Sequence, residues 1–226
     1  MKRRYQVKLS GMLLLLLITV RSMAQQDPMY SQYMFNTLAF NPAYAGSAKV
    51  FTIMALSRHQ WVGLDGAPTT QTILAHTPLK AKALAVGFTA LTDKIGPTRQ
   101  TSYFGDLAYR IRTTEETQLY FGLKGGFNLH QADLASLSTV EFDPVNVSTS
   151  GRLLPNFGFG LFWHGERYYV GLSVPKLMQN DLQSVTNELI TGATEKRHYF
   201  LTGGYVLDID RDLKFKPSFM LRSVKG

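Results

Sequence analysis

The sequence predicts an all-β chain that forms a transmembrane antiparallel β-barrel of the bacterial outer membrane. Three observations support this fold class. From Val50 onward apolar and polar residues alternate, which is the periodicity of a strand. The chain opens with an export signal, and no later apolar run is long enough for a helix to span a bilayer. The connections between the alternating segments are short and long in turn, as in transmembrane barrels.

Composition and charge exclude several other classes of protein. The 226 residues include no Cys, so thiolate nucleophiles, zinc ribbons, iron–sulfur clusters and disulfide scaffolds are excluded. The formal net charge is +8, but five of the 24 Lys and Arg residues fall within the first 21 positions. Without those five, 19 basic residues stand against 16 acidic ones. The excess charge belongs mostly to the export signal, and we expect no nucleic-acid partner.

The first 24 residues have the features of a signal peptide. Residues 2–8 include four basic side chains, and residues 12–20 form an apolar run too short to span a bilayer. Residues 22–24 place small side chains at positions −3 and −1 of a cleavage site. The mature chain would then begin at Gln25. The expected organisation is a signal peptide at 1–24, an N-terminal motif segment at 25–49 in the periplasm or the barrel lumen, and barrel strands at 50–226.

Nine segments alternate with a period of two. In the clearest of them, Leu119, Phe121 and Leu123 fall on one face, while polar residues fall on the other. Helix signals are confined to short stretches near 29–38 and 175–190. The nine predicted strands are 50–61, 69–77, 83–92, 101–112, 118–130, 155–164, 167–174, 198–207 and 213–222.

Two architectures produce such alternation, a soluble sandwich or barrel and a transmembrane barrel. Most segments reach the roughly 9–11 residues that a spanning strand needs, whereas sandwich strands average about five or six. In a transmembrane barrel the apolar face contacts lipid and the polar face lines a lumen. The residues expected to face the lumen are Arg110, Lys124, Asn128 and His130. The aromatic residues expected at the membrane interfaces are Tyr103, Tyr109, Phe121, Phe157, Trp163 and Tyr168.

The connections predict which end of the barrel carries the long loops. If the first strand runs outward, the periplasmic connections are short and fall near 78–82, 113–116, 165–166 and 208–211. The outer connections then fall near 62–68, 93–98, 131–154 and 175–197. We expect the last two, which are long, to lie on the cell surface and to recognise an external partner. The alternative is that they fold into the lumen.

The strand count indicates an incomplete barrel. Bacterial single-chain barrels have an even number of strands, whereas the sequence shows nine alternating segments. The last residues, 221–226, also lack a terminal aromatic at the close of an alternating strand. We therefore expect either that C-terminal strands are missing or that one strand is miscounted.

Residues 26–47 follow neither the helical nor the strand period. They include two Pro and two Asn, and Asn41-Pro42 favours a turn. Clustered Tyr and Phe give a large contact area at low entropic cost, which fits a docking element. The alternative is a lead-in that packs its aromatics against the base of the barrel. The residues expected to bind a partner are Tyr30, Tyr33, Phe35, Asn41, Pro42 and Tyr44.

Two blocks of this sequence carry a family resemblance. The first is 26–36 (QDPMYSQYMFN) with 40–47 (FNPAYAGS), and the second is 58–63 (RHQWVG) with 66–71 (GAPTTQ) and 76–79 (HTPL). In this order, directly after a signal peptide, they closely resemble the opening of mature PorP/SprF proteins. The later strands are similar to the family only in their pattern.

The resemblance implies an outer-membrane barrel of the type IX secretion and gliding apparatus. It implies a noncatalytic component that supports the secretion or surface anchoring of adhesin-like proteins. The implied partners are outer-membrane lipid, subunits of the secretion or gliding machinery, and a large secreted adhesin-like protein. The first alternative is a general outer-membrane diffusion channel, and the second is a soluble periplasmic β-domain.

No motif in the sequence indicates an enzyme. The five histidines are scattered over different segments, without the spacing of a metal site. There is no Gly-x-Ser-x-Gly elbow, no phosphate loop and no His-Glu-x-x-His motif. We therefore expect no catalytic residue, no metal and no cofactor. A barrel enzyme such as a lipase, with its Ser and His remote in sequence, is the alternative.

Overall fold

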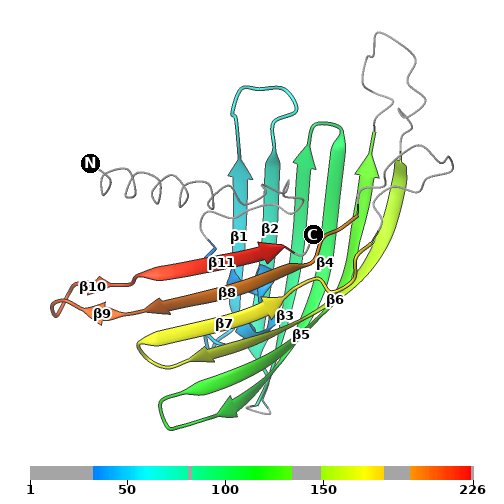
Figure 1. Cartoon of the computed structure of the whole chain (residues 1–226). Helices are drawn as coiled ribbons and strands as arrows, with labels where there is room; N and C mark the ends of the chain where they lie inside the picture. Colours follow the sequence, from blue (N-terminus) through cyan, green and yellow to red (C-terminus); the bar gives the residue numbers. More distant parts are fainter. Residues whose placement is uncertain (1–32, 81–82, 134–148, 181–193, 225–226) are drawn as a thin grey trace, which may run out of the picture.

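One antiparallel sheet, strongly curled into a half-barrel, makes up most of the structure (Figure 1). The computed structural model describes residues 33–80, 83–133, 149–180 and 194–224. Within them, nine strands pair in the order β1-β2-β3-β4-β5-β6-β7-β8-β11. The strands are β1 (Thr52–His59), β2 (Thr69–Pro78), β3 (Leu84–Ile95), β4 (Thr98–Arg112), β5 (Gln118–Ala132), β6 (Thr149–His164), β7 (Tyr168–Val174), β8 (His198–Tyr205) and β11 (Ser218–Val224).

Each strand of this sheet overlaps a segment that the alternation predicts, so the all-β fold is confirmed. The alternation predicts the strands because successive side chains point to opposite faces, and the outward face is the more apolar and more exposed of the two. Two short strands, β9 (Leu207–Asp208) and β10 (Lys214–Phe215), pair with each other beyond the end of the β8–β11 hairpin. They extend that hairpin past the edge of the main sheet (Figure 1).

Two predicted connections differ from the structure. The expected loop at 93–98 is a two-residue turn, because β3 continues to Ile95 and β4 begins at Thr98. Gly96 has a φ of 54° in this turn, a conformation that favours glycine. The expected loop at 131–154 is shorter, because β5 continues to Ala132 and β6 begins at Thr149. The rest of that loop lies outside the described residues.

Helical structure in the described residues is confined to the N-terminal motif segment. α2 (Thr37–Phe40) and η1 (Pro42–Tyr44) each make about one turn. Residues 175–180, where the second helix signal begins, are not helical, and the remainder of that signal lies outside the described residues. In the described part of the chain, no helix is both long and apolar enough to cross a membrane.

The connections distinguish two ends of the sheet. At the short-turn end, the connections 79–83, 113–117 and 165–167 join neighbouring strands. At the opposite, long-connection end lie the connections 60–68, 133–148 and 175–197, together with the turn at Gly96 and Pro97.

The convex face of the sheet is apolar and exposed. On β5, its apolar residues run from Leu119 to Leu129, a stretch of 11 residues. At about 3.3 Å per residue and a strand tilt of about 40°, this stretch covers a height of roughly 25 Å. That is the height of the apolar band on a transmembrane barrel.

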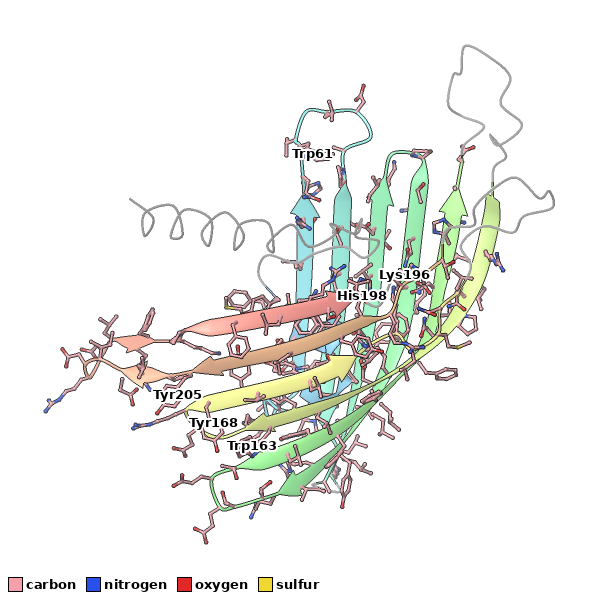
Figure 2. All side chains as sticks on the ribbon, in the orientation of Figure 1. Trp61, Trp163, Tyr168, Lys196, His198 and Tyr205 are labelled. Carbon is pink, nitrogen blue, oxygen red and sulfur yellow. The ribbon has the colours of Figure 1, made fainter. Side chains whose placement is uncertain are left out.

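Aromatic side chains mark one edge of this band. Figure 2 shows Trp163, Tyr168 and Tyr205 toward the short-turn end of β6, β7 and β8. The rings of Trp163 and Tyr168 meet edge to face with centroids 5.2 Å apart, and Tyr168 pairs directly with Tyr205 across the strands. Such a row is typical of the aromatic girdle at a membrane interface.

Candidate functional site in the concave face

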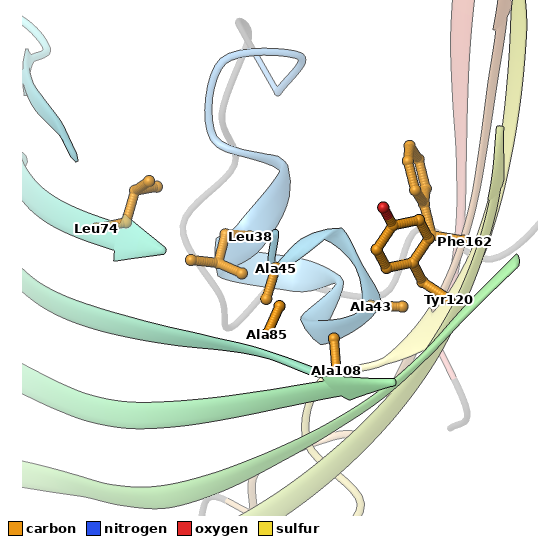
Figure 3. Close-up of a cluster of buried hydrophobic side chains, with 8 residues drawn as sticks. All are labelled: Leu38, Ala43, Ala45, Leu74, Ala85, Ala108, Tyr120 and Phe162. Carbon is orange, nitrogen blue, oxygen red and sulfur yellow. The ribbon is translucent and has the colours of Figure 1, made fainter. Parts of the chain in front are cut away.

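The N-terminal motif segment lies against the concave face of the sheet. Leu38, Ala43 and Ala45 are fully buried there. They join a cluster with side chains that point inward from several strands (Figure 3). The strand residues of this cluster are Leu74, Ala85, Ala108, Tyr120 and Phe162. The motif segment therefore supplies an apolar core for the inner side of the sheet.

Two glycines create the space for this segment. A Cβ atom at Gly122 would overlap the backbone of Pro42 and Ala43, and one at Gly160 would overlap the Asn41 side chain. The Asn41 amide lies against Gly160, where its Nδ2 donates to the Leu161 carbonyl at 3.0 Å and its Oδ1 accepts from the Ala43 N–H at 3.0 Å. The second bond also caps η1. The two glycines of the sheet and the Asn-Pro turn of the motif segment therefore have complementary shapes.

The residues expected to bind a partner separate into two groups. Asn41 and Pro42 are buried by the sheet, and Asn41 is only 1% exposed. Tyr44 is half-buried, with its ring edge-on to His76 and Phe162.

Tyr33 is half-buried and its ring lies 6.4 Å from that of Phe40. Phe35 is 57% exposed, and its neighbour Met34 is also exposed. Tyr30 lies outside the described residues. The exposed part of the described motif is therefore at Met34 and Phe35, while the Asn-Pro turn is buried against the sheet.

The residues expected to face the lumen all project from the concave face. Lys124 Nζ lies 2.9 Å from Asp106 Oδ1, and the two side chains are only 1% and 0% exposed. Lys124 also donates to the Leu38 carbonyl at 3.2 Å, so the buried cation helps to hold the motif segment. Arg110 and His130 are half-buried near opposite ends of the sheet.

Asn128 belongs to a second polar cluster, centred on Glu195. Its Nδ2 donates to Glu195 Oε1 at 2.8 Å, and Asn180 Nδ2 donates to Oε2 at 3.0 Å. Lys176 Nζ lies 3.3 Å from Oε1, and Asn156 Nδ2 lies 3.4 Å from Oε2. Glu195 is buried, and these donors neutralise and solvate its carboxylate in place of water.

This cluster changes the interpretation of the connection at 175–197. The two described ends of this connection, 175–180 and 194–197, pack against β6 and do not stand free on the surface. Leu177 N–H donates to the Phe157 carbonyl at 2.7 Å. The Asn156 side chain hydrogen-bonds the Met178 backbone N–H and carbonyl. The Arg197 guanidinium joins the two ends through the Leu177 carbonyl. For these ends the alternative of inward folding is correct. Residues 181–193 lie outside the described residues.

Sequence reasoning missed Glu195. Its partners Asn128 and Asn156 lie 67 and 39 residues away, so no local spacing links them. The sequence offers no signal for it, because the connection 175–197 holds three carboxylates and nothing in their spacing singles out Glu195. In the described residues, no group of three His, Cys, Asp or Glu side chains is placed to hold a metal ion. The arrangement can position a polypeptide segment through buried hydrogen bonds and ion pairs.

A curled antiparallel sheet with an apolar convex band and buried polar groups on its concave face defines an outer-membrane β-barrel protein. The family model of the type IX secretion system membrane protein PorP/SprF matches residues 22–226, and the chain belongs to this family. It is therefore a membrane component of the type IX secretion system, located in the outer membrane, and its membership implies contact with other subunits of that machinery. Comparisons with curated proteins and with solved structures give no match.

Proposed function

We propose that this protein is a noncatalytic outer-membrane component that supports the secretion or surface anchoring of a large adhesin-like protein, with a role in gliding. Its signal peptide at 1–24 would direct its export. The long-connection end would face the cell exterior and the short-turn end the periplasm, as is usual in transmembrane barrels.

The motif segment carries this proposal. A diffusion channel needs a lumen open to solutes, whereas here residues 36–47 pack against the concave face and the ends of the 175–197 connection cover a second part of it. A concave face that is covered in these two places agrees better with a protein that holds or docks another polypeptide. Within the motif, Met34 and Phe35 offer exposed apolar area to such a partner.

The test uses cells in which the chromosomal copy is replaced by variants of the full chain. Met34→Ser with Phe35→Ser removes the exposed apolar area without touching the buried turn. We expect surface display of the adhesin-like protein to fall at least about tenfold while the barrel stays in the outer membrane. The matched control is Leu207→Ser with Leu213→Ser, which changes exposed apolar residues of the β8–β11 hairpin.

Two readouts separate the candidate functions. Surface labelling measures display of the adhesin-like protein, and uptake of small hydrophilic solutes measures diffusion. Loss of display with unchanged uptake supports the secretion role. Loss of solute uptake on deleting the whole gene, with display unaffected, would instead identify a diffusion channel.

A further inference from the structure

Charge is almost absent from the convex face of the sheet. Among the outward positions of the nine strands of the described sheet, only Lys94 on β3 and Arg99 on β4 are charged. Both side chains are exposed, and both are cations. An otherwise uncharged membrane-facing surface therefore carries its two charges at one place.

The two cations are direct cross-strand neighbours. Lys94 pairs with Arg99 in the β3–β4 register. Side chains in such pairs have Cβ atoms about 4.5–5.5 Å apart, and like charges placed there repel each other. Among the described residues, no carboxylate lies within ion-pair distance of either cation. A bound anion between them would relieve this repulsion.

Polar side chains surround the pair at the same level. In the register, Thr69 lies beside Lys94 and Gln131 beside Arg99. The next outward positions toward the membrane centre are Thr92 and Thr101, whose hydroxyl oxygens are 3.4 Å apart. Hydroxyl and amide groups next to two cations are the groups that coordinate a phosphate.

The height of the pair matches the headgroup layer of a membrane. Arg99 pairs with Gln131, two residues beyond Leu129, where the apolar band on β5 ends. At about 3.3 Å per residue and a tilt of about 40°, the pair lies roughly 5 Å beyond the edge of that band along the membrane normal. Long cationic side chains at this level extend along the apolar surface and place their charge at the lipid headgroups.

We propose that Lys94 and Arg99 form a binding site for a phosphate group of an anionic lipid headgroup in the outer leaflet. The Arg99 guanidinium offers paired N–H donors to phosphate oxygens, and Lys94 adds a second positive charge. A lipid is the ligand because the pair faces outward from the barrel wall and adjoins the apolar band, where acyl chains lie.

The experiment measures lipid binding to the purified full chain in neutral detergent micelles. Bisphosphorylated lipid A, its dephosphorylated form and inorganic phosphate are titrated separately, and binding is followed by native mass spectrometry. Lys94→Gln with Arg99→Gln should weaken lipid A binding at least about tenfold. The matched control, Lys214→Gln with Lys216→Gln, removes the same charge at the short-turn end and should leave binding unchanged.

A second measurement separates binding from folding. Without lipid, heat-modifiable gel mobility should show the Lys94→Gln, Arg99→Gln variant to be at least as stable as the parent, because two repelling charges are gone. The exchange Lys94→Arg with Arg99→Lys should keep lipid A binding within about threefold. Equal binding of dephosphorylated lipid A, equal weakening by the control pair, or saturation by millimolar inorganic phosphate alone would each overturn the lipid site.

Discussion

The Lys124 ammonium and the Asp106 carboxylate lie in a part of the concave face that water barely reaches. Removing one charge leaves the other buried without its counter-ion, which costs about 3–5 kcal/mol in buried pairs. We therefore expect Lys124→Met to lower the free energy of unfolding by about this amount, as measured by urea titration of the refolded barrel in lipid vesicles.

The exposed pair of Lys214 and Asp208, with 3.6 Å between the charged atoms, provides the control. Lys214→Met should change the free energy of unfolding by at most about 1 kcal/mol, because water screens such pairs. Equal effects of the two substitutions would mean that the Lys124 pair does not stabilise the interior.

A single methyl group at Gly160 tests the fit between wall and motif segment. Its Cβ would overlap the Asn41 side chain, and overpacking of this kind costs about 1–3 kcal/mol. We expect Gly160→Ala to displace the Asn-Pro turn, so that a cysteine at position 43 reacts with a water-soluble maleimide. Gly105→Ala is the matched control, because its Cβ would have nearest contact with the Gly125 carbonyl oxygen at 3.9 Å. Equal reactivity in both backgrounds would show that the turn is not seated against β6.

Among the elements, the motif segment contributes directly to the packing of the concave face. The sequence leaves open whether this segment docks a partner or packs its aromatics against the base of the barrel. Deleting 36–47 would expose the inward faces of Tyr120 and Phe162 and remove a partner of Lys124. We expect this deletion to lower the unfolding temperature, read from heat-modifiable gel mobility, by more than about 10 °C. The reason is that buried contacts worth several kcal/mol of unfolding free energy are lost. An unchanged midpoint would restore the purely docking interpretation.

Glu195 holds the ends of the 175–197 connection on the wall. Without its carboxylate, the buried amide groups of Asn128 and Asn156 lose an acceptor, at a cost of about 1–3 kcal/mol for a buried polar group. We expect Glu195→Ala to increase proteolysis near 175–180 several-fold in intact cells. Glu166→Ala, at an exposed turn, should leave the cleavage rate as in the parent. Equal cleavage in the two variants would contradict the anchoring role.

The elements differ in how far the sequence could predict them. Strands were found because one face of each contacts lipid and so repeats every second residue. The sequence predicts a loop in place of the turn at Gly96, since Lys94 and Arg99 interrupt the apolar pattern on the outward face. The hydrogen bond from Asn41 to Leu161 spans 120 residues. The position of the motif segment therefore depends on tertiary contacts that local periodicity cannot reveal.

At the scale of the whole molecule, the curled sheet presents two different surfaces. The convex face offers an apolar band to lipid, and parts of the concave face are covered by the motif segment and by the ends of the 175–197 connection. The sequence predicts that the interior is a polar lumen accessible to water. The structure instead buries Lys124 and Asn128 beneath the motif segment and the ends of the 175–197 connection, respectively.

A spin-label scan along β5 of the full chain in lipid vesicles distinguishes a covered concave face from an open channel. Labels at Phe121, Leu123 and Phe127 should collide with oxygen dissolved in the lipid, because these residues are exposed on the convex face. Labels at Lys124 and Asn128 should be shielded from both oxygen and a water-soluble nickel chelate, because both positions are covered. High access of the nickel chelate at 124 and 128 would indicate an open channel, and high access at 121 and 123 would contradict the membrane-facing band.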